Sequence, residues 1–285
     1  MDIGISEEIR IRGCEQNPKI IVFDAKLLEI YELIRNFDMD QVAYNPETLR
    51  SVLKKSYQFF ERYYELHKVP YEEVRKIGKY ELSIEGMRSP FRLPIRRVDE
   101  DVYYGLLNEF VIFGEKPRWV FRHVELPKKI TEVSTLSYVH EITHSQDNHI
   151  YGSIKNYYNT EVLSIFNELL CAGSMDDGGR LLYLNDVVRL HNLRFGIQTL
   201  QDYRDKEDEF RDQLLEGSCY VESTVKAYNM YMDYIEGDRR TREYIILMIQ
   251  KVFDGEITLE QCLEALDVTY QNSLNSKRLA KYLKR

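Results

Sequence analysis

The sequence Thr131-Glu132-Val133-Ser134-Thr135-Leu136-Ser137-Tyr138-Val139-His140-Glu141-Ile142-Thr143-His144 contains the pattern His-Glu-x-x-His within a stretch that reads as helical. On a helix, His140 and His144 project from one face, where two imidazoles can occupy adjacent corners of a tetrahedral Zn²⁺ site. Glu141 then points at the metal-bound water, whose pKa zinc lowers towards about 7. The alternative is a helix with exposed histidines and a solvated glutamate. The choice between these two interpretations depends on whether the sequence offers a third metal ligand.

The candidates for this third ligand follow the motif. A third histidine six residues after the second would indicate a metzincin, but that position is Ile150, and His149 comes one residue too early. Asp147 is expected on the same helix as the motif, where closing the tetrahedron is awkward. The better candidate is Glu161, at the start of a second expected helix that begins after Thr160 and stops at Gly173.

This second helix carries another carboxylate. Glu161 and Glu168 are two turns apart and share a face. One can bind the metal while the other hydrogen-bonds the free ring nitrogen of a ligand histidine, which fixes the histidine tautomer. Taken alone, Glu161 could instead be a favourable acid in the first helical turn and Glu168 a solvated residue. Next to the His-Glu-x-x-His pattern, the metal site is the favoured interpretation.

The two segments together resemble a known family. Val133-Ser134-Thr135-Leu136 precedes HExxH, and a later segment reads E-x-x-S-x-x-N-E with Glu161, Ser164, Asn167 and Glu168. This combination is similar to the thimet oligopeptidase and oligoendopeptidase F zinc peptidases. The resemblance implies a zincin-like helical domain in which Glu161 is the third zinc ligand and Glu168 supports a histidine.

The resemblance extends to two further segments. Tyr228, Tyr231 and Tyr234 form a stripe on an expected helix, and the tyrosine-rich helix of that family stabilises the oxyanion and holds substrate. It therefore implies Tyr231 or Tyr234 as the oxyanion donor and Tyr228 as a substrate contact, although a half-buried aromatic stripe is the alternative. Residues 119–126 would correspond to an edge strand that pairs with substrate, with His123 as a further substrate contact.

The rest of the chain has a simple organisation. Helical spacing of apolar residues predicts two helices between residues 25 and 67, short strands follow between 80 and 126, and helices return after Pro127. We expect a mainly α protein with a small β-sheet in its first half. Residues 1–116 would form an N-terminal helical and β lobe and residues 117–285 the catalytic region, unless the two form one continuous domain.

Composition narrows the class of partners. The 285 residues are 44% hydrophobic and have a net charge of -8, which argues against nucleic acid as the main partner. Apolar runs stay well below the roughly 18 residues that a membrane span needs, so no membrane is expected. Residues 1–8 lack the basic and apolar regions of a secretory signal, and a cytoplasmic location is the default expectation.

The sequence therefore predicts a zinc-dependent metallopeptidase that hydrolyses peptide bonds of oligopeptides, with one Zn²⁺ as cofactor. His140, His144 and Glu161 would bind the metal, and Glu141 would act as general base. The alternatives are a noncatalytic peptide-binding protein on a zincin scaffold and a zinc hydrolase that acts on another amide. Retention of Glu141 argues against the first alternative, because this residue is needed for chemistry and not for metal binding.

Overall fold

The computed structural model describes residues 20–36, 43–64, 75–77, 81–83, 95–98, 105–113, 116–127, 129–151, 160–175 and 179–284, with backbone only for the strands, for 144–151 and for positions 57 and 160. The prediction of a mainly helical protein is confirmed. No helix among these residues has the length and apolar composition needed to cross a membrane. The helices are α2 (Ala25–Ile34), α3 (Leu49–Tyr64), α4 (Ser134–Tyr151), α5 (Thr160–Met175), α6 (Arg180–Asp202), α7 (Glu207–Glu236), α8 (Arg239–Asp254), α9 (Leu259–Ala265), α10 (Tyr270–Ser273) and α11 (Ser276–Leu283).

Local side-chain chemistry sets several helix boundaries. Asp238 Oδ1 accepts a hydrogen bond of 2.8 Å from the Thr241 backbone N–H and opens α8. The same helix ends at Gly255, whose φ of 75° lies in the left-handed region that favours glycine. Thr258 and Gln261 form a capping box at the start of α9. These ends can be read from the sequence without reference to the rest of the molecule.

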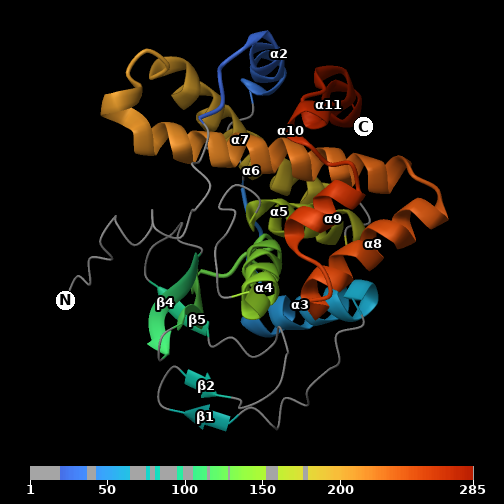
Figure 1. Ribbon diagram of the computed structural model, residues 1–285. Helices are drawn as coiled ribbons and strands as arrows, with labels where there is room; N and C mark the ends of the chain where they lie inside the picture. Colours follow the sequence, from blue (N-terminus) through green and yellow to red (C-terminus); the bar gives the residue numbers. More distant parts are fainter. Residues whose placement is uncertain are drawn as a thin grey trace.

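Helix α5 lies at the centre of the protein. Every side chain from Val162 to Ala172 is buried, so this helix is enclosed on all sides rather than amphipathic. It packs against α4, α6 and α7. Figure 1 shows α7 running across the molecule with α2 and α11 on one side and α3, α4 and α5 on the other. The interior position of α5 is what brings its polar residues into contact with the neighbouring helices.

The N-terminal helices share this core. Leu27 and Ile30 of α2 and Phe60 of α3 are buried in the same apolar cluster as the central helices. Helix α2 packs against α6 and α11, and α3 against α4 and α8. The described helices before residue 116 are thus continuous with the C-terminal region. A separate lobe for residues 1–116 stays a prediction, since much of the remaining segment lies outside the described residues.

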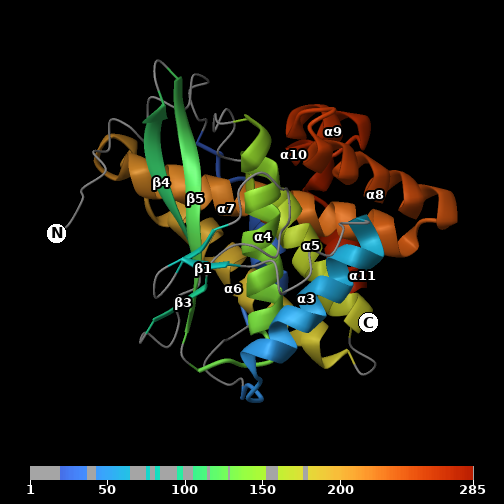
Figure 2. The same cartoon turned by 90° about the horizontal axis from the view of Figure 1, so that it is seen from below.

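Besides the helices, the described residues form strands. They are β1 (Arg75–Ile77), β2 (Glu81–Ser83), β3 (Ile95–Val98), β4 (Gly105–Phe113) and β5 (Lys116–Pro127). The backbone of β5 pairs antiparallel with β4 along most of its length and parallel with β3 from residue 124 onward. Both views place β4 and β5 next to α4 (Figures 1 and 2). Because only their backbone is described, a small sheet in a zincin-like arrangement stays a prediction.

The position of β5 differs from the expected edge strand. The order β3-β5-β4 makes β5 the middle strand, although residues 119–126 were expected at an edge. Val124 and Glu125 have partners on both sides and residues 126–127 pair with β3 alone, whereas His123 pairs with Leu107 of β4 on one side among the described residues. The part of β5 able to receive an added strand therefore lies before residue 124. The side chain of His123 is outside the described residues, so its predicted substrate contact stays a prediction.

Candidate metal centre

The His-Glu-x-x-His sequence lies on a helix, as expected. Helix α4 begins where Ser134 Oγ accepts a hydrogen bond of 3.0 Å from the Thr131 backbone N–H. His140 and Glu141 follow in its middle, and both side chains are buried. The backbone of His144 lies one turn after His140 on this helix, which places the two histidines on the same face. The side chain of His144 is outside the described residues.

The imidazole of His140 lies between two carboxylates of α5. Its Nε2 is 3.1 Å from Glu161 Oε2, and its Nδ1 is 2.8 Å from Glu168 Oε1. Seven residues along a helix are about two turns, so both glutamates leave α5 on the face that meets α4. The structure thus brings together His140, Glu161 and Glu168, and it assigns one ring nitrogen to each glutamate.

Behind Glu168 lies a residue that the sequence analysis missed. Arg189 of α6 binds Glu168 with a two-pronged contact from Nε and Nη2 to the two carboxylate oxygens. The side chain of Glu168 is 1% exposed and that of Arg189 15% exposed, so the carboxylate is buried and the guanidinium mostly so. The sequence carried no clear signal for this residue, because the segment from Asn185 to Asn192 mixes polar and apolar residues and Val187 and Val188 do not share the helical face of Arg189.

These contacts govern the charge of the cluster. Burial alone lowers the pKa of His140, but the charges and hydrogen bonds of Glu168 and Glu161 outweigh it and raise this pKa to about 10. Burial raises the pKa of Glu168, and Arg189 together with His140 lowers it below its usual value. Without a metal ion, the imidazole is therefore a cation between two carboxylates. A metal ion that binds Nε2 has to displace the proton on that atom.

A chain of hydrogen bonds joins the two sequence motifs. Tyr64 of α3 donates its hydroxyl proton to Asn167 Oδ1, and Asn167 Nδ2 donates to Thr143 Oγ1 at 3.0 Å. Thr143 Oγ1 in turn donates to the Val139 carbonyl oxygen at 2.8 Å. All of these side chains are buried. The chain pins α4 to α5 one turn after His140 and one residue before Glu168, which fixes the register of the two helices at the cluster.

The geometry around His140 Nε2 fits two ligands of one metal ion. With zinc–ligand bonds of about 2.0–2.1 Å, two corners of a tetrahedral site lie roughly 3.3 Å apart. The observed 3.1 Å between His140 Nε2 and Glu161 Oε2 is close to that separation. Among the side chains that the structure describes, no set of three His, Cys, Asp or Glu residues converges on one point. His144, which would supply the third ligand, is not among those side chains.

The tyrosines singled out in the sequence lie away from this cluster. Tyr231 packs its hydroxyl against Gly173, where the missing Cβ leaves room for it. Tyr234 contacts the ring of Phe166, and burial together with Tyr63 raises its pKa to about 12. At about 100° per residue, both Phe166 and Gly173 point away from the face of α5 that carries Glu161 and Glu168. The structure therefore does not bring Tyr231 or Tyr234 to His140.

The direction of α7 explains this placement. Cys219 of α7 lies near the start of α5, where burial and the charge of Glu161 raise its pKa to about 12. Tyr231, twelve residues later, meets Gly173, which is also twelve residues after Glu161. The two helices thus run side by side in the same direction, and Gly173 is roughly 18 Å along α5 from Glu161. The turn of α7 that faces the cluster contains Cys219, and the tyrosine stripe lies farther along.

Tyr228 belongs to a second buried polar group. Its hydroxyl donates to Asp186 Oδ1 at 2.6 Å, and Tyr282 of α11 donates to both oxygens of Asp186 at 3.1 Å. Burial raises the pKa of Asp186 to about 7 against the opposing effect of these two hydrogen bonds. The Tyr228 hydroxyl is therefore engaged in holding α11 to α6 and α7. Its predicted contact with substrate stays a prediction.

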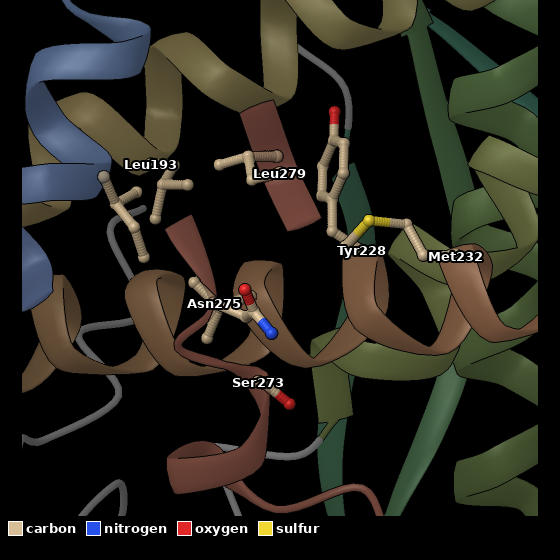
Figure 3. Close-up of a pocket in the computed structure, with 8 residues that line it drawn as sticks. Leu193, Tyr228, Met232, Ser273, Asn275 and Leu279 are labelled. Atoms are coloured by element: carbon tan, nitrogen blue, oxygen red, sulfur yellow. The ribbon is translucent and has the colours of Figure 1, made fainter. Parts of the chain in front are cut away.

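Figure 3 shows the cavity that adjoins this group. It has a volume of about 10 Å³ and is lined mostly by apolar side chains from α2, α6, α7 and α11, among them Leu193, Met232 and Leu279. A cavity of this size has room for no more than one water molecule. It is a packing gap beneath α11 and has no room for a peptide.

The buried carboxyl of Asp186 predicts a pH dependence of stability. Its pKa of about 7 in the folded protein lies above the value of about 4 in an unfolded chain, so between these values the folded state binds more protons. Stability should therefore fall as the pH rises from 5 to 8. Between pH 5 and the folded-state pKa of about 7 the loss is about 1.4 kcal/mol per pH unit, so this group accounts for a fall of up to about 3 kcal/mol over the range.

Urea unfolding of the wild type and of Asp186→Asn at pH 5 and pH 8 measures this contribution. The asparagine keeps one acceptor oxygen for the tyrosine hydroxyls and does not titrate. The wild type should lose more unfolding free energy between the two pH values than the variant does. Equal losses in both proteins would show that Asp186 is already ionised at pH 5 in the folded state.

Comparison of the chain with models of protein families, with curated proteins and with solved structures gave no match. No relative therefore supplies a function. What the protein does has to be inferred from its own residues and their geometry.

Proposed function

We propose that this protein is a zinc-dependent metallopeptidase whose metal ligands are His140, His144 and Glu161. The observation that carries the proposal is the position of His140, with Nε2 at 3.1 Å from Glu161 Oε2 and Nδ1 at 2.8 Å from Glu168 Oε1. A carboxylate on the second ring nitrogen is the usual support of a zinc-bound histidine. This arrangement joins the two motifs that resemble the thimet oligopeptidase and oligoendopeptidase F peptidases.

Each residue has a distinct task in this proposal. Bound zinc would polarise the peptide carbonyl and lower the pKa of water. Glu141, next to the first ligand on α4, would take a proton from the attacking water and pass it to the leaving amine. Glu168 would hold the proton on His140 Nδ1 and so keep Nε2 free. The zincin-like arrangement follows as part of the proposal, with α4 between α5 and the strand β5.

The substrate class rests on the same resemblance. We expect oligopeptides in extended conformation, with residues of β5 before position 124 as the segment that a peptide backbone could join. Tyr231 and Tyr234 of α7 pack against other faces of α5, so a different group would have to stabilise the oxyanion.

Zinc content tests the proposal. The wild type, purified without added metal and then reconstituted with zinc after chelator treatment, should contain one zinc ion per chain by elemental analysis. Glu161→Ala should lose most of it, because a ligand is removed. Glu260→Ala provides the matched control, since Glu260 is exposed on α9 and far along the chain from the motifs. Absence of zinc from the reconstituted wild type would overturn the proposal, as would equal zinc in Glu161→Ala.

A further inference from the structure

The ion pair between Glu168 and Arg189 lies directly behind the proposed metal ligand His140. Arg189 approaches Glu168 from α6, a helix that carries neither of the two sequence motifs. Taking two charges out of water is costly, and a buried ion pair often gives no more stability than two well-packed apolar side chains. A role in orienting the carboxylate accounts for the pair better than a role in stability alone.

The contact geometry defines that role. The torsion that sets the plane of a glutamate carboxylate has broad, weakly defined minima, so Glu168 alone would not keep its oxygens in one orientation. The planar guanidinium of Arg189 binds both oxygens and fixes that plane. The same Oε1 atom lies 2.8 Å from His140 Nδ1. Fixing Glu168 therefore fixes the ring of His140, with Nε2 directed at Glu161.

The action of Arg189 on His140 passes through Glu168. Arg189 Nη2 is 3.5 Å from His140 Nδ1, farther than the 2.8 Å that separates Glu168 Oε1 from the same nitrogen. When Nδ1 carries a proton, both groups are donors and cannot bind each other. Glu168, which accepts from both, is the group that connects them.

We propose that Arg189 is a positioning residue for the metal ligand His140 and that it acts by holding the carboxylate of Glu168. This inference rests on the proposed zinc site. With Arg189 in place, His140 donates its Nδ1 proton to Glu168 and presents the Nε2 lone pair to the metal. Without it, Glu168 is free to rotate, and the ring of His140 loses its fixed orientation.

The zinc dissociation constant tests this inference, measured by competition with a chromophoric chelator. Replacing partners that support a ligand histidine typically weakens metal binding about 10- to 100-fold, and we expect this loss for Arg189→Met and for Glu168→Gln. Arg189→Lys should recover part of the affinity, because lysine restores the charge but not the two-pronged contact. The double variant Arg189→Met with Glu168→Gln should bind zinc no more weakly than Glu168→Gln alone, because the effect of Arg189 requires Glu168.

Two controls accompany these variants. Arg194→Met makes the same substitution on the same helix, at a residue that binds the Arg35 carbonyl oxygen and His191, and it should bind zinc like the wild type. The ring nitrogen NMR shifts of His140 in the zinc-loaded protein should show a protonated Nδ1 in the wild type and a changed signal in Arg189→Met. Far-UV circular dichroism establishes that each variant is folded.

The outcomes separate this inference from the zinc site itself. If the wild type binds zinc and Arg189→Met binds it equally well, the positioning role is overturned and the zinc site stands. The same conclusion follows if the two single losses multiply in the double variant. A wild type that does not bind zinc overturns both proposals. If Arg189→Met does not fold, two comparisons still test the positioning role. Arg189→Lys is compared with the wild type, and the double variant is compared with Glu168→Gln.

Discussion

Glu141→Gln should retain zinc and lose peptide hydrolysis by a factor of about 10² to 10⁴, the range that a positioned general base contributes. Glutamine has almost the same shape as glutamate, but its amide cannot take a proton from water. Glu141 is buried on α4 immediately after the ligand His140, and metal binding does not require its charge. The substitution therefore separates the chemical step from the metal site.

The measurement is cleavage of a mixed library of oligopeptides by the zinc-loaded protein, followed by mass spectrometry, with zinc content determined on the same samples. Glu260→Gln, an exposed residue of α9, is the matched control and should cleave like the wild type. A Glu141→Gln protein that cleaves at the wild-type rate would exclude Glu141 as the base. A zinc-loaded wild type that cleaves no peptide would favour a noncatalytic peptide-binding protein or, if other amides are hydrolysed, a different zinc hydrolase.

Glu168→Leu should lower the free energy of unfolding of the metal-free protein by about 3–5 kcal/mol, the usual cost of removing one partner from a buried ion pair. The substitution leaves the buried guanidinium of Arg189 without its carboxylate and removes the acceptor of His140 Nδ1. The remaining positive charges then lie close together, since Arg189 Nη2 and His140 Nδ1 are 3.5 Å apart. Repulsion between them adds to the cost of burying each charge.

Urea unfolding near neutral pH measures this cost, with Glu260→Leu as an exposed control that should change stability by less than about 0.5 kcal/mol. Glu168→Leu combined with Arg189→Leu should regain much of the lost stability, because no unpaired guanidinium remains. If the double variant is no more stable than Glu168→Leu, the loss comes from packing or from His140 rather than from the unpaired arginine.

Much of the candidate site could be anticipated from local spacing. Histidines four residues apart and glutamates seven residues apart must share a face wherever the backbone is helical. The placement of His140 on α4 and of Glu161 and Glu168 on one face of α5 follows from that rule. The tyrosine stripe obeyed the same rule, yet Tyr231 and Tyr234 lie away from His140. Helical spacing tells which residues share a face of one helix and says nothing about the partner that this face meets.

Arg189 shows that helical spacing also cannot predict which residues on different helices will form an ion pair. It lies 21 residues after Glu168 and 49 after His140, on a helix without a recognisable motif. The residues one turn away on its face of α6, Asn185, Asp186, Asn192 and Leu193, are mostly polar, so the local sequence does not mark this arginine as one with a buried partner. Several acidic residues of the chain could serve as that partner, and only the packing of α6 against α5 selects Glu168.

The sequence by itself determined the mainly helical class, the capped ends of α8 and α9 and the residues that share each helical face, because these depend on interactions within a few residues of the chain. The tertiary structure alone decided which faces meet. It placed both ring nitrogens of His140 between Glu161 and Glu168, set Arg189 behind them and directed Tyr231 and Tyr234 elsewhere. The physical reason is that the direction and register of α5 against α4, α6 and α7 result from the packing of many apolar side chains at once.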